Sequence, residues 1–378
     1  SRGLGDVYKR QGVGLYNFTA VYEGTFRPKE SGAYELLIEG DDGYRVYVNG
    51  EKVIDYWGEH ASAKREYTLK AIAGTDYKIR IEYMQAGAEA LLRFDLGVYR
   101  HISPEMVVDR VKEADIVIFA GGISPSLEGE EMYSVNSPGF AGGDRTSIEL
   151  PQVQRDILKA LKKAGKKVVF VNCSGSAVAL VPEMESCDAI LQAWYPGQAG
   201  GLAVADVLFG DFNPSGKLPV TFYKNTDQLP DFEDYSMKNR TYRYMTEVPL
   251  FPFGYGLSYT TFDISKGRLN KKTISAGQDL NFKVNVKNTG KYDGAEVIQV
   301  YVRKVDDAEG PIKSLRAFRR VPLKAGETCV VSIDLLPTTF ELFDPTTNTM
   351  RIMPGKYEIM YGNSSDIPSG NKLSVTLR

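Results

Sequence analysis

The sequence predicts three successive domains: a β-sandwich, a partial α/β sandwich with a mainly parallel sheet, and a second β-sandwich. In the first and last thirds of the chain, apolar residues alternate with polar ones, which is typical of half-buried strands. In the middle third, short apolar runs alternate with helical patterns, which favours βαβ units and a parallel sheet. The length of 378 residues and the 43% hydrophobic content leave room for two to three cores.

We expect the first sandwich at residues 16–98, the α/β unit at 99–225, a linker at 226–261 and the last sandwich at 262–378. Residues 1–15 are expected to be unstructured or a foreign junction, because they show neither an initiator methionine nor an apolar signal sequence. The α/β unit is short for a doubly wound sheet, so we expect its first strands upstream, with the first sandwich inserted. The chain is therefore expected to be a fragment of a longer protein.

The first domain shows clear strand and turn signals. Ile79, Ile81 and Tyr83 alternate with charged residues, and Asn49-Gly50 is typical of a tight hairpin turn. Aromatic-rich strands separated by turns at this spacing indicate an antiparallel sandwich.

The middle third begins with Ser103-Pro104, a helix N-cap followed by proline at the first helical position. A later helix is expected to open at Pro151, to bury Val153, Ile157, Leu158 and Leu161 on one face, and to stop at Gly165. The other expected elements are a helix to about residue 113, strands over 115–120, 167–172 and 189–193, and a helix over 201–209 ended by Gly210.

The last domain repeats the strand pattern of the first. Leu280, Phe282, Val284 and Val286 alternate with polar residues, and Asn-Thr-Gly, Ala-Gly and Pro-Gly turns follow at intervals. About 115 residues with this spacing favour a fibronectin-like or immunoglobulin-like sandwich.

Composition excludes several functions. The net charge is −2 without a basic block, so neither nucleic acid nor an anionic membrane is an expected partner. The apolar runs are too short to span a bilayer. The three cysteines have no CxxC spacing and the two histidines lie far from them, so we expect no metal and no cofactor.

The acidic loop after the strand over 115–120 is the main candidate site. It places Glu128, Glu130 and Glu131 within four positions at the carboxyl end of the strand, which is where open α/β sheets bind ligands. Crowded carboxylates repel one another, so at least one should keep its proton near neutral pH and suit general-acid catalysis on a glycosidic oxygen. The alternative is a solvated acidic loop.

Serine, glycine, cysteine and aromatic residues also lie near these strand ends. Ser174 and Ser176 lack a GxSxG pattern, so capping of the next helix is expected. Gly121-Gly122 lacks a phosphate-loop pattern, and Cys173 is expected to be a small core residue. Trp194-Tyr195 fits a sugar-stacking platform and a packed loop equally well.

The first domain resembles the sandwich domain named after anthrax protective antigen. The segments that carry this resemblance are Tyr22-Glu23-Gly24, Ser31–Tyr34, Asp41–Gly50 and Val53–Trp57. In some sugar-binding relatives an Asp-Asp pair such as Asp41-Asp42 holds calcium. A turn-shaping role is favoured here, because calcium needs six to eight oxygens and no other acids cluster nearby. Trp57 is a weak candidate for contact with an outer sugar, where the domain would favour short substrates.

The remaining chain resembles family-three glycoside hydrolases of the β-xylosidase and β-glucosidase type. The segments that carry this resemblance are Gly142–Thr146, Glu149–Gln152, Ala193–Gln198, Val207–Pro219, Tyr242–Tyr244, Phe251–Tyr259, Val286–Gly290 and Glu296–Tyr301. The resemblance implies an exo-acting retaining enzyme that removes terminal xylose or glucose from small oligosaccharides. It also implies that Glu130 is the acid/base, with Glu128 as runner-up and tuning partner. Glu131 departs from the pattern, because many relatives have glycine at this position.

The resemblance also implies what the chain lacks. The nucleophile would lie on an N-terminal barrel of the same protein, so the fragment alone is expected to be inactive. A periplasmic or extracellular location is expected, and a homo-oligomer is left open. The competing hypothesis is a carbohydrate-binding or adhesive module, with an incidental acidic loop.

Overall fold

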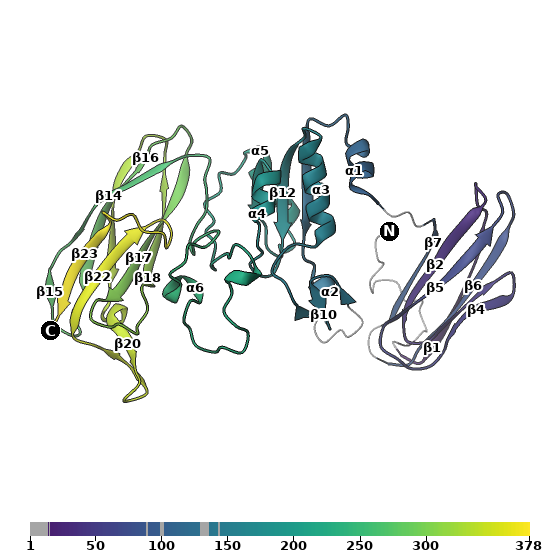
Figure 1. Ribbon diagram of the computed structural model, residues 1–378, viewed down its shortest axis with the longest axis horizontal. Helices are drawn as coiled ribbons and strands as arrows, with labels where there is room; N and C mark the ends of the chain where they lie inside the picture. The colour runs from purple at the N-terminus through teal and green to yellow at the C-terminus, as the bar shows by residue number, and fades with distance from the viewer. Residues whose placement is uncertain (1–13, 15, 88–89, 99–101, 129–135, 143) are drawn as a thin grey trace. The chain divides into compact units, whose positions relative to one another are not determined.

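The chain folds into two compact units, residues 1–102 and 103–378. The computed structural model is drawn in Figure 1. It describes residues 14, 16–87, 90–98, 102–128, 136–142 and 144–378.

The first unit consists of two antiparallel sheets. One has the strand order β1 (Phe18–Phe26), β6 (Tyr77–Gln85), β3 (Tyr44–Val48) and β4 (Glu51–Tyr56). The other has the order β5 (Ala63–Ala71), β2 (Gly32–Asp41) and β7 (Leu91–Gly97). Leu36, Ile38 and Val46 are buried between them.

The strand and hairpin predictions for this unit are confirmed. Ile79, Ile81 and Tyr83 are buried, while the residues between them are more exposed. Asn49 and Gly50 join β3 to β4, and their φ angles of 51° and 87° are those that a two-residue hairpin turn requires.

The second unit begins with a three-stranded parallel sheet of order β13 (Ala189–Gln192), β12 (Lys167–Cys173) and β8 (Ile116–Gly122). Its helices are α1 (Pro104–Arg110), α2 (Pro125–Glu128), α3 (Gln152–Lys163), α4 (Val181–Ser186) and α5 (Gly200–Phe209). Three short strands follow α2: β9 (Asn136–Ser137), β10 (Phe140–Ala141) and β11 (Asp144–Arg145). The predicted parallel sheet is therefore present.

Most of the helix ends predicted for this α/β domain agree with the observed helices. Ser103 caps α1 by accepting a hydrogen bond from the Met106 N–H at 3.4 Å, although the helix ends at Arg110 rather than near 113. Gly210 ends α5 with a φ of 84°. Leu158 and Leu161 of α3 are fully buried, but Val153 in its first turn is 53% exposed, contrary to the expected four-residue apolar face.

The last domain is a sandwich of two sheets. One has the order β14 (Phe262–Leu269), β16 (Leu280–Asn288) and β19 (Thr328–Leu335). The other has the order β15 (Thr273–Ile274), β23 (Lys372–Leu377), β22 (Gly355–Gly362), β17 (Gly294–Lys304) and β18 (Ser314–Leu323). A 3₁₀ turn (Pro337–Phe340) and the hairpin β20 (Glu341–Asp344) and β21 (Thr349–Ile352) complete it.

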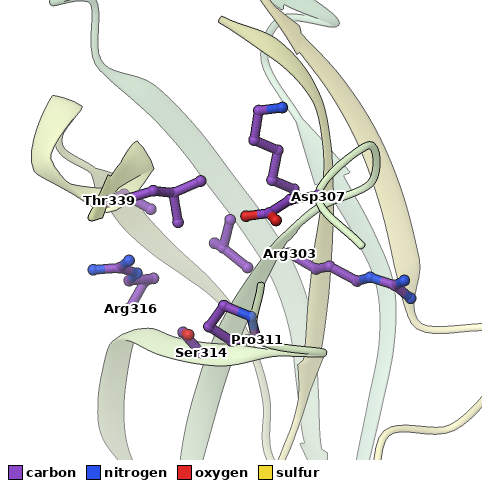
Figure 2. A pocket seen from close by; sticks show the side chains of 9 residues that line it. Arg303, Asp307, Pro311, Ser314, Arg316 and Thr339 are labelled. Carbon is purple, nitrogen blue, oxygen red and sulfur yellow. The ribbon is translucent and has the colours of Figure 1, made fainter. Parts of the chain in front are cut away.

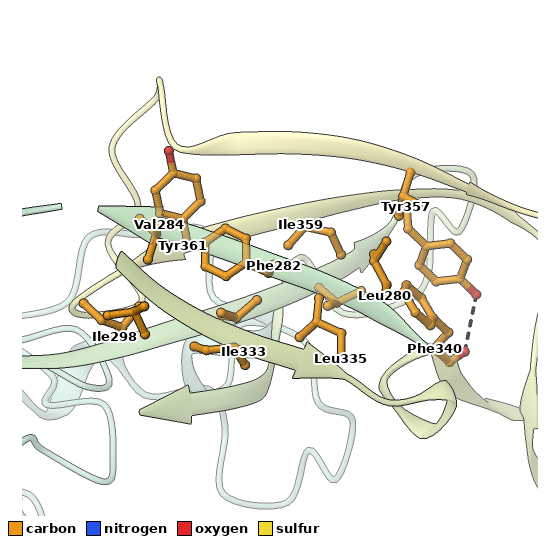
Figure 3. Close-up of a cluster of buried hydrophobic side chains, with 14 of the residues drawn as sticks. Leu280, Phe282, Val284, Ile298, Ile333, Leu335, Phe340, Tyr357, Ile359 and Tyr361 are labelled. Atoms are coloured by element: carbon orange, nitrogen blue, oxygen red, sulfur yellow. Dashed lines mark hydrogen bonds between the residues drawn. The ribbon is translucent and has the colours of Figure 1, made fainter. Parts of the chain in front are cut away.

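Figure 3 shows the core of this domain, in which Leu280, Phe282 and Val284 of β16 meet Ile359 and Tyr361 of β22. The alternation read from the sequence is therefore the inward face of β16. Among the described residues, the longest apolar helices are too short to cross a lipid bilayer.

The segment expected to be a linker is folded against both of its neighbours. It contains a 3₁₀ turn (Thr226–Gln228) and α6 (Thr241–Tyr244). The Leu250 N–H donates to Phe222 O at 2.8 Å, and the Ser365 N–H donates to Phe253 O at 2.8 Å. The α/β sheet and the last sandwich are thus connected by backbone hydrogen bonds as well as by chain continuity.

Candidate active site

The carboxyl ends of the three parallel strands bring together several residues that the sequence places at strand ends. The ladder pairs Gly122 of β8 with Cys173 of β12, and Asn172 with Gln192 of β13. The acidic loop leaves β8 at this edge. The structure therefore confirms that the loop starts at the edge where ligands bind in open α/β sheets.

Gly121-Gly122 closes the strand tightly. Gly122 has a φ of 123°, and a Cβ placed on it would lie 1.9 Å from Cys173 O. The Ile123 N–H donates to the same carbonyl at 2.8 Å. Only glycine fits this backbone conformation and this close approach of two strand ends. Gly122 is thus explained by strand packing.

Gln154 in the first turn of α3 binds Gly122 through both ends of its amide. Its Oε1 accepts from the Gly122 N–H at 2.8 Å, and its Nε2 donates to Gly122 O at 2.7 Å. This paired contact satisfies both backbone groups of the last residue of the strand ladder. It fixes the point at which the acidic loop departs.

The serines after β12 do not cap the next helix, which corrects the prediction. Ser174 is buried and donates to Ser176 O at 2.9 Å, while Gln192 Nε2 donates to Ser174 Oγ at 3.1 Å. Helix α4 begins only after Leu180, because Ala179 first forms a parallel bridge with Glu149. Ser174 therefore belongs to a hydrogen-bond network at the sheet edge.

The expected core cysteine is also a different one. Cys173 is partly exposed, whereas Cys187 belongs to the apolar core. Burial raises the pKa of the Cys187 thiol to about 12.

The Trp194-Tyr195 pair packs the loop after β13, although a sugar contact by Tyr195 stays open. Trp194 lies against the core and meets Phe222 edge-on, with ring centroids 6.0 Å apart. The Tyr195 ring covers Gly175, where an added Cβ would lie 2.6 Å from the ring. Its hydroxyl donates to Ile123 O at 2.8 Å. Tyr195 thus holds the residue next to Gly122, while 42% of its surface remains exposed.

Arg145 fixes the returning end of the loop. Its Nη1 donates to Ser176 Oγ at 2.9 Å, and its Nε donates to Ser147 O at 3.2 Å. Both ends of the acidic loop are thus held by hydrogen bonds. Its first end, at Gly122 and Ile123, is bound by Gln154 and Tyr195, and its second end is bound by Arg145 to the segment after β12.

Glu149 forms further hydrogen bonds in the segment that follows the acidic loop. Its carboxylate accepts from the Thr226 N–H at 3.0 Å, from the Thr226 hydroxyl at 2.6 Å and from the Ser147 hydroxyl. Burial by itself would raise the pKa of Glu149, but these hydrogen bonds outweigh it and lower the pKa to about 2. Glu149 is therefore ionised at neutral pH and unsuited to act as a general acid.

The predicted acid/base, Glu130, and its neighbour Glu131 lie outside the described residues, as does the side chain of the runner-up Glu128. Their assignment stays a prediction. The structure describes only what lies before and after them, namely the end of β8 and the segment from β11 onward.

The two candidates in the first unit have structural partners. Asp42 is 6% exposed and its carboxylate accepts from the backbone N–H groups of His60 and Ala86 at 2.9 and 2.7 Å. Burial opposes ionisation, but these backbone hydrogen bonds prevail and lower the pKa of Asp42. Trp57 is 40% exposed, and the Arg45 guanidinium lies 4.5 Å from its ring centroid. Within the described residues, no three His, Cys, Asp or Glu side chains gather as a metal site.

A separate small pocket lies in the last domain, and Figure 2 shows Asp307, Ser314 and Arg316 around it. Asp307 is the sole carboxylate among its described lining residues. Glycoside hydrolysis uses two carboxyls, so the pocket does not have the groups for that chemistry.

Comparisons with known proteins define the class. The family model of the glycosyl hydrolase family 3 C-terminal domain matches residues 36–259, and that of the fibronectin type III-like domain matches 296–365. These matches define the class of domains found in the C-terminal part of glycoside hydrolases. The chain belongs to glycosyl hydrolase family 3, as its sequence motifs predicted.

Two curated relatives are similar over much of the chain. A xylan 1,4-beta-xylosidase of Xylanibacter ruminicola is 52% identical over 96% of this chain and 42% of the relative. A periplasmic beta-glucosidase of Salmonella typhimurium is 38% identical over 70% of this chain and 35% of the relative. The chain thus spans less than half the length of these relatives.

A solved structure is similar to almost all of the chain. The beta-glucosidase of Kluyveromyces marxianus in complex with glucose has a TM-score of 0.75 and 28% identity, over 99% of this chain and 46% of that one. The likeness supports the β-rich, multidomain fold class. The exact domain limits stay predictions.

The sequence did not identify the residues that hold the two ends of the acidic loop by hydrogen bonds, namely Gln154, Arg145 and Glu149. Arg145 and Glu149 lie in segments that carried the family resemblance, which was the available signal. Gln154 had none, because its partner Gly122 is distant in the sequence and the pairing exists only once α3 packs on the sheet.

Proposed function

We propose that this chain is the C-terminal part of an exo-acting, retaining β-glycosidase that removes terminal β-linked xylose or glucose from oligosaccharides. The observation that carries the proposal is the 52% identity to a xylan 1,4-beta-xylosidase over 96% of the chain. The relative named a periplasmic beta-glucosidase keeps glucose as an alternative sugar and supports a periplasmic or extracellular location.

The proposal requires a longer protein. The relatives exceed this chain more than twofold in length, since it spans 42% and 35% of them. The edge strand β8 also leaves Ile116 and Ile118 56% and 50% exposed. Apolar side chains on a sheet edge favour cover by a further segment. An N-terminal domain of the longer protein would provide this cover and the nucleophilic carboxylate.

Within that protein, the acidic loop would deliver the second carboxyl. A retaining enzyme places its two carboxyls roughly 5–5.5 Å apart, one as nucleophile and one as acid and later base. Glu130 would protonate the departing oxygen and then activate water. Glu128 and Glu131 would raise its pKa by repulsion, which keeps a proton on it near neutral pH. Neither a metal nor a cofactor has a role in this chemistry.

The first sandwich would influence which lengths of oligosaccharide the longer protein prefers. Trp57 remains the candidate for contact with an outer sugar, because it is partly exposed and its ring is already oriented by Arg45. Deletion of residues 16–97 from the longer protein would then raise activity on longer oligosaccharides relative to disaccharides. An unchanged chain-length preference would refute this role.

The test of the function is expression of the longer protein beside this chain. The longer protein should hydrolyse p-nitrophenyl β-xyloside or β-glucoside with retention of configuration, and the chain alone should hydrolyse neither. A longer protein that binds xylo-oligosaccharides in calorimetry without hydrolysing them would instead identify a binding module. Activity lost with a chelator and restored by calcium would overturn the metal-free mechanism and revive Asp42 as a ligand.

A further inference from the structure

The first residues of the acidic loop, Gly122 and Ile123, form hydrogen bonds with three different parts of the fold. Gln154 of α3 holds both backbone groups of Gly122 at 2.8 and 2.7 Å. Cys173 O, at the end of β12, accepts from the Ile123 N–H at 2.8 Å. The Tyr195 hydroxyl, after β13, donates to Ile123 O at 2.8 Å.

These contacts exceed what strand pairing alone requires. The β8–β12 ladder already ends at Gly122, so the side chains of Gln154 and Tyr195 add fixed partners beyond it. Two consecutive residues thus have all four of their backbone polar groups satisfied from outside the loop: Gly122 by Gln154, and Ile123 by Cys173 and Tyr195. Such a base fixes the backbone of Gly122 and Ile123, where the acidic loop begins.

We infer that Gln154 and Tyr195 are positioning residues for the general acid on this loop. The inference rests on the proposed function and deepens it. Neither side chain reacts: they act through Gly122 and Ile123, and so set where the loop carboxyl meets the departing oxygen. A displacement of about 1 Å in a catalytic group can cost on the order of 10²-fold in rate. Loss of a fastening should therefore impair proton donation more than it impairs binding.

The chain provides matched controls for both residues. Gln152 lies in the same turn of α3, but its amide donates to Asp156 on the helix surface at 2.8 Å. Tyr259 is 47% exposed and, like Tyr195, donates its hydroxyl to a backbone carbonyl, that of Val207. Gln152→Leu and Tyr259→Phe thus remove the same chemical groups away from the loop base.

The experiment uses the longer protein and two aryl glycosides of the sugar it prefers. The 2,4-dinitrophenyl glycoside needs no protonation of its leaving group, whereas the phenyl glycoside does. Gln154→Leu should lower kcat for the phenyl glycoside roughly 10–10²-fold, within the usual share of general-acid catalysis. Activity on the dinitrophenyl glycoside should stay within about threefold. KM should change little for either substrate.

Tyr195→Phe keeps the ring over Gly175 and removes only the hydroxyl, so it tests the inference if Gln154→Leu does not fold. It should show the same leaving-group dependence with a smaller loss, on the order of 5–20-fold. Because the ring remains, a role in stacking on sugar would leave the rates unchanged. Gln152→Leu and Tyr259→Phe should resemble the parent protein on both substrates.

Two results would overturn the inference. One is an equal loss on both glycosides with a lowered melting temperature, which would show a purely structural role. The other is unchanged kinetics in both variants. If Glu130→Gln still showed leaving-group dependence in either case, the proposed function would stand while the positioning role failed. A parent protein without glycosidase activity would instead refute the proposed function itself.

Discussion

The two β-sandwiches are built from similar, mainly antiparallel sheets, but they belong to different compact units of the chain. The last sandwich shares one compact unit with the α/β sheet, whereas the first forms a unit of its own. Lys217, which follows the α/β sheet, pairs with Glu296 of β17 at 2.7 Å, with side chains only 12% and 6% exposed. By contrast, the ion pair between Arg27 and Asp76 stays within the first sandwich, with side chains 65% and 51% exposed.

Further buried contacts repeat the pattern. Gln299 Nε2 donates to Gly254 O at 3.0 Å, and an added Cβ on Gly254 would lie 2.0 Å from Gln299 Oε1. The last sandwich therefore braces the segment that leads out of the α/β sheet. The two sandwiches thus differ in their ion pairs: one pair is buried between the last sandwich and the segment before it, and the other is exposed within the first sandwich.

The largest expected effect is at the buried ion pair. Glu296→Gln should lower the free energy of unfolding of the second unit by about 3–5 kcal/mol, because Lys217 is left buried without a countercharge. Asp76→Asn, the exposed counterpart, should change that of the first unit by less than about 1 kcal/mol. Urea unfolding distinguishes the units, since Trp57 is in the first and Trp194 in the second. Equal effects would contradict the comparison.

Core truncation tests whether the two units unfold separately. Leu36→Ala should destabilise only the transition reported by Trp57, by about 2–5 kcal/mol. Phe282→Ala should destabilise only the transition reported by Trp194, by about 3–5 kcal/mol. Variants that keep a single tryptophan give the two transitions independently. A shift of both transitions by either substitution would show that the units unfold together.

A smaller effect is expected at Glu149, and it depends on pH. The pKa of Glu149 is lowered from 4.5 to about 2, so its contribution is complete above pH 4.5 and is lost as pH falls toward about 2. Glu149→Gln should therefore reduce stability by roughly 1–3 kcal/mol at neutral pH, and the difference should shrink across that window. Urea unfolding reported by Trp194 would measure it. A difference that stays constant from pH 6 to pH 2 would show that the charge is not involved.

Much of the fold was predictable because its signals are local. Ser103 and Gly210 marked helix ends through capping and a left-handed backbone, and the alternation in β16 gave the inward face of the last sandwich. Several motifs that follow one another in the order typical of the family indicated glycosyl hydrolase family 3. These features need only neighbouring residues to be recognised.

The position of the candidate site in the sheet could be predicted from the sequence, but the residues that hold the acidic loop could not. The strand end before Glu130 was predicted two residues early, at 120 rather than at Gly122. The pairing of Gln154 with Gly122 depends on how α3 packs on the sheet. Ser174 was taken for a cap because it follows a strand, but the bridge between Ala179 and Glu149 delays the helix. Contacts between distant segments leave little trace in a single sequence.

The central claim is that the acidic loop supplies the general acid through Glu130, and the leaving-group dependence of two variants tests it most directly. In the longer protein, Glu130→Gln should slow the phenyl glycoside roughly 10²–10⁴-fold, spare attack on the 2,4-dinitrophenyl glycoside, and allow azide to rescue deglycosylation. Glu128→Gln should mainly shift the acidic limb of the pH profile. If Glu128→Gln shows the leaving-group dependence and azide rescue while Glu130→Gln does not, the acid/base is assigned to the wrong carboxyl.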